Sequence, residues 1–135
     1  MGPMVLACVA LSPQAADSLR ELGVCDSKRF GAGPAAHRAR LQLAEHIERC
    51  AAHVGVAVIS PNEIDARIGQ LNHLEREHAS RLIDAAPRCA RIFADGARLF
   101  APLAERYPQL VAQDRGESAF VCVAAASIIA KAQRD

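Results

Sequence analysis

Asp95 is one of several side chains in this sequence whose type and position suggest chemistry. It follows the apolar pair Ile92-Phe93 and precedes a glycine, in the segment RIFADG. Functional groups of open α/β sheets gather at the carboxyl ends of strands, so Asp95 is a candidate site residue. Asp-Gly is also a common turn pair, and for this motif taken alone the turn is the favoured interpretation.

The final segment, VCVAAASIIAKAQRD, predicts a helix with one chemically distinct side. Ser127, Lys131 and Asp135 are spaced i, i+4 and i+8, so they lie roughly along one side of that helix. The alanines around them allow its backbone to approach a neighbouring element closely. The alternative is a buried helix ending in an exposed Lys–Asp pair, in the weaker orientation for helix stabilisation.

The loop segment CDSKRF is a third candidate. Ser27 and Lys28 offer a hydroxyl and an ammonium group that could hold a phosphate. In the structural alternative, Asp26 caps a helix or turn and Lys28 is merely solvated. The five histidines share no spacing, so we interpret each as a structural or solvated side chain and not as a metal ligand.

Strands that alternate with helices position these residues and argue for one α/β domain over residues 1–135. Ser60, Pro61 and Glu63 predict a capped helix start, and Asn72 with Glu75 repeats the capping pattern. We expect strands over residues 4–12, 54–60, 88–95 and 109–113, and helices over residues 14–22, 34–53, 61–65, 72–86, 101–107 and 119–134.

Composition sets limits without identifying a function. The chain is 51% hydrophobic with a formal charge of +1, which neither indicates nucleic-acid binding nor excludes a local basic groove. Five cysteines without metal-ligand spacing predict reduced thiols and a cytoplasmic protein. The longest apolar run, residues 120–130, is too short to span a bilayer, and the apolar N-terminus is interpreted as a buried strand.

The order of the motifs resembles that of the type 2 ribonucleases H, the ribonuclease HII family. DSK comes early, SPNEID in the middle, ADG at a strand end, and AAASIIAK followed by RD at the close. The segments LNHLEREHASRLI and DRGES look most like the archaeal and eukaryotic branch. The resemblance covers nearly the whole chain, and AAASIIAK with RD is its most specific part.

The resemblance implies a ribonuclease H-like fold, with a mixed central sheet flanked by helices. It implies an endoribonuclease that hydrolyses the RNA strand of RNA–DNA hybrids or cuts at ribonucleotides embedded in DNA. By motif, Asp95 and Asp135 match active-site aspartates that bind Mg²⁺ or Mn²⁺, which are hard cations with oxygen ligands. Ser27 and Lys28 match the segment that contacts the substrate phosphate. No protein partner is inferred from the resemblance.

The sequence departs from the family at both ends. Members begin with a strand that ends in an Asp-Glu-Ala-Gly-Arg-Gly motif, and they continue beyond the RD pair. We therefore expect residues 1–135 to be a partial catalytic domain whose first strand is missing. The alternatives are a truncated domain that binds nucleic acid without cutting it, and an unrelated α/β domain whose motifs match by chance.

Overall fold

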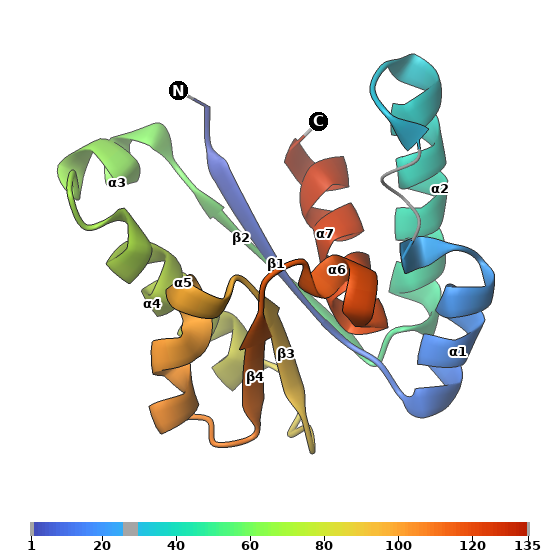
Figure 1. The fold of residues 1–135 in the computed structure, drawn as a ribbon. Helices are drawn as coiled ribbons and strands as arrows, with labels where there is room; N and C mark the ends of the chain where they lie inside the picture. Colours follow the sequence, from blue (N-terminus) through green and yellow to red (C-terminus); the bar gives the residue numbers. More distant parts are fainter. Residues whose placement is uncertain (1, 26–29, 135) are drawn as a thin grey trace.

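The computed structural model describes residues 2–25 and 30–134 (Figure 1). Strands and helices alternate along the chain, which confirms the expected α/β class. The strands are β1 (Met4–Ala10), β2 (His53–Ile59), β3 (Ile92–Asp95) and β4 (Leu110–Gln113). The helices are α1 (Pro13–Glu21), α2 (Pro34–Cys50), α3 (Pro61–Ala66), α4 (Leu71–Ala85), α5 (Ala97–Phe100), the 3-10 helix η2 (Ala101–Glu105), α6 (Gly116–Ala119) and α7 (Val121–Arg134).

The strands that the structure describes form two separate two-stranded sheets. β1 and β2 are antiparallel, with Met4 opposite Ile59 and Ala10 opposite His53. β3 and β4 are parallel, with Asp95 opposite Gln113. Both kinds of pairing expected of a mixed sheet are therefore present, divided between two sheets.

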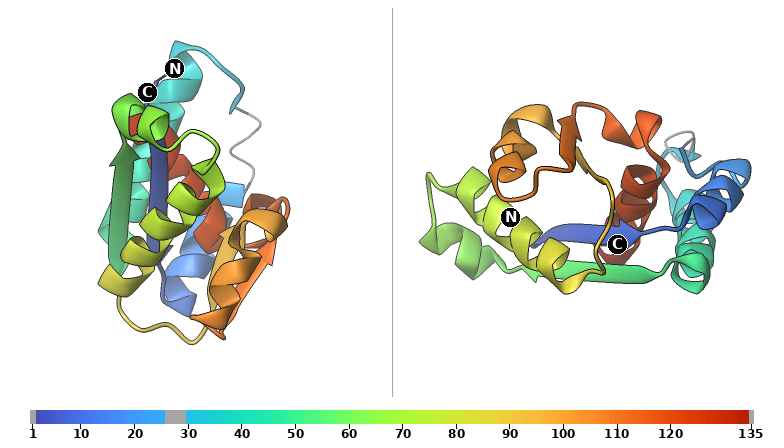
Figure 2. Two further views of the ribbon diagram at one scale, coloured as in Figure 1. Left: turned by 90° about the vertical axis from the view of Figure 1, so that its left-hand side faces the viewer. Right: turned by 90° about the horizontal axis from the view of Figure 1, so that it is seen from below.

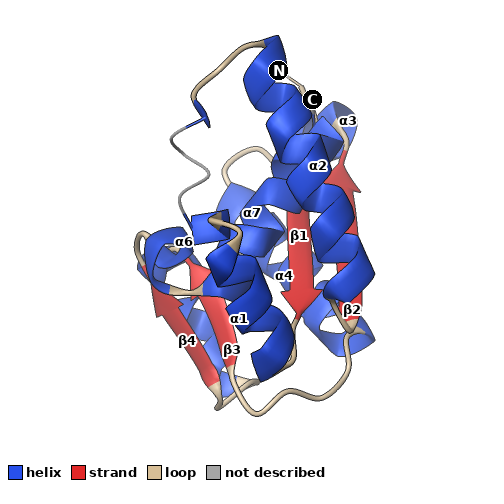
Figure 3. Cartoon of the chain, turned by 90° about the vertical axis from the view of Figure 1, so that its right-hand side faces the viewer, coloured by secondary structure: helices blue, strands red, loops and turns tan. Residues whose placement is uncertain are grey.

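Helix α7 occupies the centre of the molecule. It packs against β1 on one side and against α2 on the other, as Figures 1 and 3 show. Ala124 and Ala125 are 2% and 0% exposed, so the small residues let the helix lie close to its neighbours, as the sequence predicted. Its core cluster also includes apolar side chains of β1, α1 and α2, among them Val9, Leu19 and Ile47.

A second core lies beneath β3 and β4 and fixes their position. Leu103, Tyr107 and Leu110 are buried together, with Ile83 of α4 packed against them. The Tyr107 hydroxyl donates to Asp84 Oδ1 at 2.6 Å, which links the chain after η2 to the end of α4. The second view of Figure 2 shows this half of the molecule beside α4.

The two predicted capping patterns have different outcomes. Ser60 caps α3 as expected, because its hydroxyl accepts the Glu63 N–H at 3.2 Å. The prediction that Asn72 caps the next helix is wrong. Helix α4 begins one residue before Asn72, at Leu71, and its N-cap Gln70 makes no side-chain capping bond. The sequence around Asn72 and Glu75 fits the capping pattern, but the chain turns at Gly69, which has φ +83°, and the helix begins directly after that turn.

Two negative findings also concern the described part of the chain. No helix there is both long and apolar enough to cross a membrane. No disulfide joins the five cysteines, all of which fall within the described ranges, as expected for reduced thiols.

Candidate functional site

Asp95 lies where its sequence context predicted, as the last residue of β3. Its side chain is exposed, and its Oδ1 accepts the backbone N–H of Gly116 at 3.1 Å. Gly116 is buried at the start of α6, directly after β4 and the turn that follows it. The candidate carboxylate is thus accessible to solvent while one of its oxygens is held by the neighbouring loop.

At Gly116, α6 lies close to β3. A Cβ atom at this position would meet Asp95 Cα and Val123 Cγ1, each at 3.4 Å. The rings of Phe93 and Phe120 stack just beside this contact, with centroids 4.1 Å apart. An aromatic contact of this kind adds to the stabilisation from buried area, so it helps to hold the N-terminal end of α7 against β3.

A second carboxylate, that of Glu117, lies next to this contact. It is half-buried, and its Oε2 accepts a hydrogen bond from the Ser127 hydroxyl at 3.1 Å. Ser127 belongs to α7, so this bond places Glu117 against the first half of that helix. Ser127 faces this acid, whereas the sequence had grouped it with Lys131 and Asp135.

Sequence reasoning missed Glu117 as a candidate. The segment DRGES contributed only to the choice of family branch, although it follows the short strand QLVAQ as closely as Gly96 follows β3. The same rule that selected Asp95, an acid just beyond the end of a strand, would have selected Asp114 and Glu117. The signal was present, but the strand predicted there, residues 109–113, was too short to give it much weight.

Three of the four predicted site residues, Asp135, Ser27 and Lys28, lie outside the described residues. The description of α7 ends at Arg134. This helix has 14 residues, so its two ends are about 20 Å apart at 1.5 Å per residue. Asp95 contacts the segment that leads into the N-terminal end of α7, and Figure 1 shows the opposite end beside the chain's N-terminus.

No group of three or more His, Cys, Asp or Glu side chains in the described ranges is arranged to hold a metal ion. Asp95 and Glu117 are nevertheless hard oxygen donors of the kind that Mg²⁺ and Mn²⁺ accept. By donor type, these two carboxylates suit such an ion, and the remaining ligands would come from water, from substrate or from the rest of the protein.

A large groove connects Asp95 with β1 and α7. Its volume is about 1010 Å³, and β1 and β3 form two of its walls. Leu82 and Ile83 of α4 and the side of α7 that carries Cys122 and Ser127 also line it. We call this cavity the interstrand groove. Asp95 lies on its wall, so the candidate carboxylate borders a cavity whose other described walls are mostly apolar.

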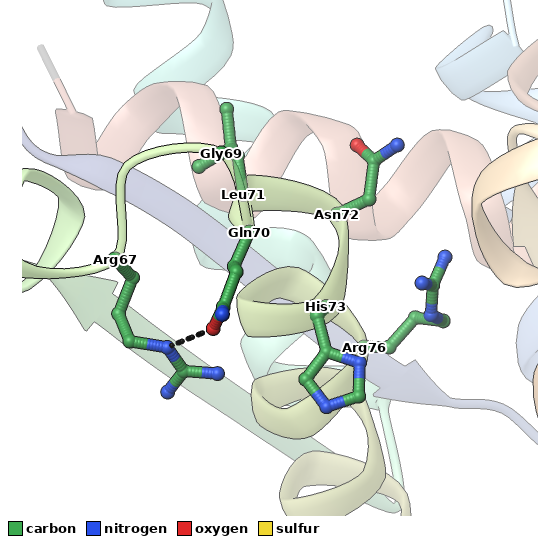
Figure 4. Close-up of a pocket in the computed structure, with 7 residues that line it drawn as sticks. All are labelled: Arg67, Gly69, Gln70, Leu71, Asn72, His73 and Arg76. Atoms are coloured by element: carbon green, nitrogen blue, oxygen red, sulfur yellow. Dashed lines mark hydrogen bonds between the residues drawn. The ribbon is translucent and has the colours of Figure 1, made fainter.

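A smaller cavity of about 630 Å³ lies at the start of α4 (Figure 4). Its polar lining includes Arg67, Gln70, His73 and Arg76. The Arg67 guanidinium is already engaged, because it donates to Gln70 at 3.0 Å and to both carboxylate oxygens of Glu77. Arg76 donates to the Leu99 carbonyl at 3.0 Å and so ties α4 to α5. Because both arginines are engaged within the fold, we interpret this cavity as a place where α3, α4 and α5 are joined and not as a binding site.

Comparison with known proteins identifies relatives over the whole chain. The family model described as Ribonuclease HII matches residues 1–135. Ribonuclease HII of Pyrococcus furiosus is 33% identical over 144 residues, which span 100% of this chain and 62% of that protein. The Pyrobaculum aerophilum protein of the same name is 36% identical over 153 residues, spanning 100% of this chain and 63% of that protein. The chain thus spans slightly less than two thirds of these curated relatives.

Solved structures confirm the fold. The ribonuclease HII of Archaeoglobus fulgidus, solved in complex with PCNA, matches with a TM-score of 0.82 and 33% identity. That match covers 99% of this chain and 65% of the solved one. Ribonuclease H2 of Pyrococcus horikoshii has a TM-score of 0.86 at 26% identity, covering 100% and 66% of the two chains. The expected ribonuclease H-like fold is therefore correct, and the chain belongs to the ribonuclease HII family.

Proposed function

We propose that the protein is a metal-dependent endoribonuclease that hydrolyses the RNA strand of RNA–DNA hybrids. The observation that carries this proposal is an exposed aspartate, Asp95, braced at the end of a strand in a chain of the ribonuclease HII family. Because the chain covers 62% of its Pyrococcus furiosus relative, the activity is proposed for the protein as a whole. Residues 1–135 are proposed to form part of its catalytic domain.

The proposed metal is Mg²⁺ or Mn²⁺. Asp95 and Asp135 are its ligands by family motif, and Glu117 is a further described carboxylate close to the loop that Asp95 contacts. Held by such carboxylates, a divalent ion would supply an activated water and would stabilise the charge that develops during phosphodiester cleavage. The protein's own contribution is to hold the carboxylates at fixed positions while Asp95 stays accessible to the substrate.

Ser27 and Lys28 are proposed to bind the substrate phosphate. A hydroxyl donor beside an ammonium group offers one hydrogen bond and one full charge to a phosphate oxygen. Neither side chain has an acid–base role in this proposal. The substrate class is an RNA–DNA hybrid or DNA that contains ribonucleotides, and the proposed location is cytoplasmic.

The test is cleavage of a labelled RNA–DNA hybrid by the protein that carries this chain. Asp95→Asn should abolish cleavage while leaving the fold intact, because the amide oxygen still accepts from Gly116 but the ligand charge is lost. Asp65→Asn, which changes an exposed aspartate of α3, is the matched control and should cut normally. Undiminished cutting by Asp95→Asn would refute the role of Asp95.

Binding without cutting is the second outcome that the experiment separates. If the wild-type protein binds hybrid but does not cut it with either metal, the proposed activity is wrong and the protein is a nucleic-acid-binding module. If it neither binds nor cuts hybrid, the proposed substrate class is wrong.

A further inference from the structure

The loops that follow β3 and β4 are held by a crossed pair of carboxylate caps. Asp95, at the end of β3, accepts the Gly116 N–H at the start of α6 at 3.1 Å. Asp114, directly after β4, accepts the Ala97 N–H at the start of α5 with its Oδ1 at 2.9 Å. Each aspartate thus accepts the first backbone N–H of the short helix that follows the other strand. That N–H group has no hydrogen-bond partner inside its own helix.

The backbone between these contacts includes one conformation that requires support. Gly96 has φ +106°, which glycine adopts readily, but Arg115 has φ +58°, the one positive φ among the described non-glycine residues. A left-handed conformation at a non-glycine residue is unfavourable and persists only where surrounding contacts maintain it. The Gly96 N–H also donates to the Gln113 carbonyl at 3.1 Å, which extends the β3–β4 ladder by one bond. The turn that carries Asp95 is therefore fixed from the β4 side.

We propose that Asp114 is a positioning residue for the acidic site. By holding Ala97 it fixes the turn after Asp95, and this keeps the Asp95 carboxylate against Gly116. Asp95 Oδ2, which makes no hydrogen bond within the described ranges, is then presented to a cation in a constant place. This inference rests on the proposed role of Asp95 as a metal ligand, and Asp114 itself touches neither metal nor substrate.

The physical reason is that a carboxylate ligand binds well only when its own position is maintained. Groups that orient metal ligands affect metal affinity although they do not touch the metal. A bond between an exposed carboxylate and a backbone N–H contributes modestly, so its loss should loosen the turn without unfolding the domain. The effect of Asp114 should therefore appear in the behaviour of Asp95 and Gly116 more than in overall stability.

Amide hydrogen exchange in the intact protein tests whether the two caps are coupled. Asp114→Ala removes the acceptor, whereas Asp114→Asn keeps an oxygen acceptor for Ala97, and both lose the charge. Asp114→Ala should speed exchange of both the Ala97 and the Gly116 amides by about 3- to 10-fold, and Asp114→Asn by less than about twofold. A local cap would change Ala97 alone, and that result would overturn the proposal.

Mn²⁺ titration gives a second readout that a purely structural role would not move. The Mn²⁺ dissociation constant of Asp114→Ala should exceed that of Asp114→Asn by about 3- to 10-fold, although the two proteins have the same charge. Asp65→Ala, which removes an exposed carboxylate from α3, should bind Mn²⁺ as the wild type does. Equal affinities of the Ala and Asn variants would show that Asp114 acts by charge alone, which overturns the proposal.

The two proposals can fail separately. If Asp95→Asn leaves Mn²⁺ affinity unchanged, the metal role of Asp95 is wrong, and Gly116 exchange still reports whether Asp114 holds that side chain. If Asp114→Ala does not fold, Asp114→Ser replaces it, because the shorter Ser hydroxyl reaches Ala97 less well. In Asp114→Ser, the Gly116 amide should exchange faster than in the wild type but more slowly than in a fully released loop. If the Ala97 amide exchanged faster while the Gly116 amide kept its wild-type rate, the inference would be overturned.

Discussion

The two oxygens of the Asp95 carboxylate have different environments. Oδ1 accepts a backbone N–H from Gly116, while Oδ2 makes no hydrogen bond to any residue that the structure describes. A backbone donor on one oxygen fixes the side chain without neutralising it, so the charge stays available to a cation. At the scale of single residues, the remaining question is which second acid lies opposite Asp95.

Two acids compete for that role, and variants of each distinguish them. Asp135 matches the family motif, whereas Glu117 is adjacent to Gly116, the residue that Asp95 contacts. From the contacts of the described residues we expect Glu117→Gln to reduce hybrid cleavage by about 10- to 100-fold, the range for losing a group that supports a metal ligand. The Asp135→Asn variant, measured in parallel, should lose as much if the motif-based proposal is right.

The comparison has a clear control. Glu105→Gln changes an exposed glutamate of η2 and should leave cleavage unchanged. Normal cleavage by Glu117→Gln beside an inactive Asp135→Asn would show that the contact with Ser127 serves structure only. The reverse result would assign the second ligand to Glu117 in place of Asp135.

Lys28 is expected to act on binding and not on the chemical step. Removal of one phosphate contact should weaken hybrid binding, and the loss in Lys28→Ala should be larger at low salt, where phosphate contacts contribute most. The measurement is the dissociation constant for a hybrid over a series of salt concentrations. A variant that binds normally at low salt but cuts slowly would contradict a purely binding role.

At the scale of elements, Glu75 on α4 gives the structure a pH-dependent weakness. Its side chain lines the interstrand groove, and burial raises the pKa of its carboxyl group, an effect that nearby Arg76 partly offsets. The folded state therefore binds this proton more tightly than the unfolded state does. Stability attributable to Glu75 is greatest below its ordinary pKa and falls as pH rises through the raised value.

Glu75→Gln should therefore stabilise the protein near neutral pH and have little effect at about pH 4. The expected gain in the free energy of unfolding is below about 1 kcal/mol, because the carboxyl group is only partly buried. Urea unfolding at the two pH values measures it, with Glu45→Gln on the exposed face of α2 as control. A gain of equal size at both pH values would contradict a cause in ionisation.

Most elements could be predicted from sequence, because apolar periodicity and caps are local signals. β1, β2 and α2 lie where the apolar patterns placed them, and Asp95 ends β3 as expected. The short helices α5 and α6 were not predicted, since four residues carry too little periodicity. Glu117 was missed for a related reason: its neighbour Gly116 meets Asp95 only because β3 pairs with β4, which no local pattern encodes.

At the scale of the whole molecule, the interstrand groove separates the β1–β2 sheet from the β3–β4 sheet. In a single mixed sheet, the four strands would be joined by hydrogen bonds. β1 pairs with β2, and β3 pairs with β4, so β1 and β3, which both line the groove, each have one unpaired edge among the described strands. Helix α7 contacts both β1 and β3 and so holds the two sheets on one support. Open strand edges beside apolar side chains are a known cause of self-association.

We therefore expect residues 1–135, expressed alone, to self-associate or to pack loosely, and thiol reactivity can locate the contact. Cys8 and Cys122 line the groove, whereas Cys50 is exposed at the end of α2. Burial raises the pKa of Cys8 and of Cys122, so at neutral pH both should react with a thiol reagent more slowly than an ordinary exposed cysteine, even in a monomer.

The informative quantity is consequently the change with protein concentration. As the concentration rises, association through the groove edges should slow labelling of Cys8 and Cys122 further and leave Cys50 unaffected, in step with the mass measured by sedimentation. Association that protects Cys50 instead would place the contact on another surface. A monomer at all concentrations with a sharp, cooperative thermal transition would show that α7 alone suffices to hold the two sheets, despite their open edges.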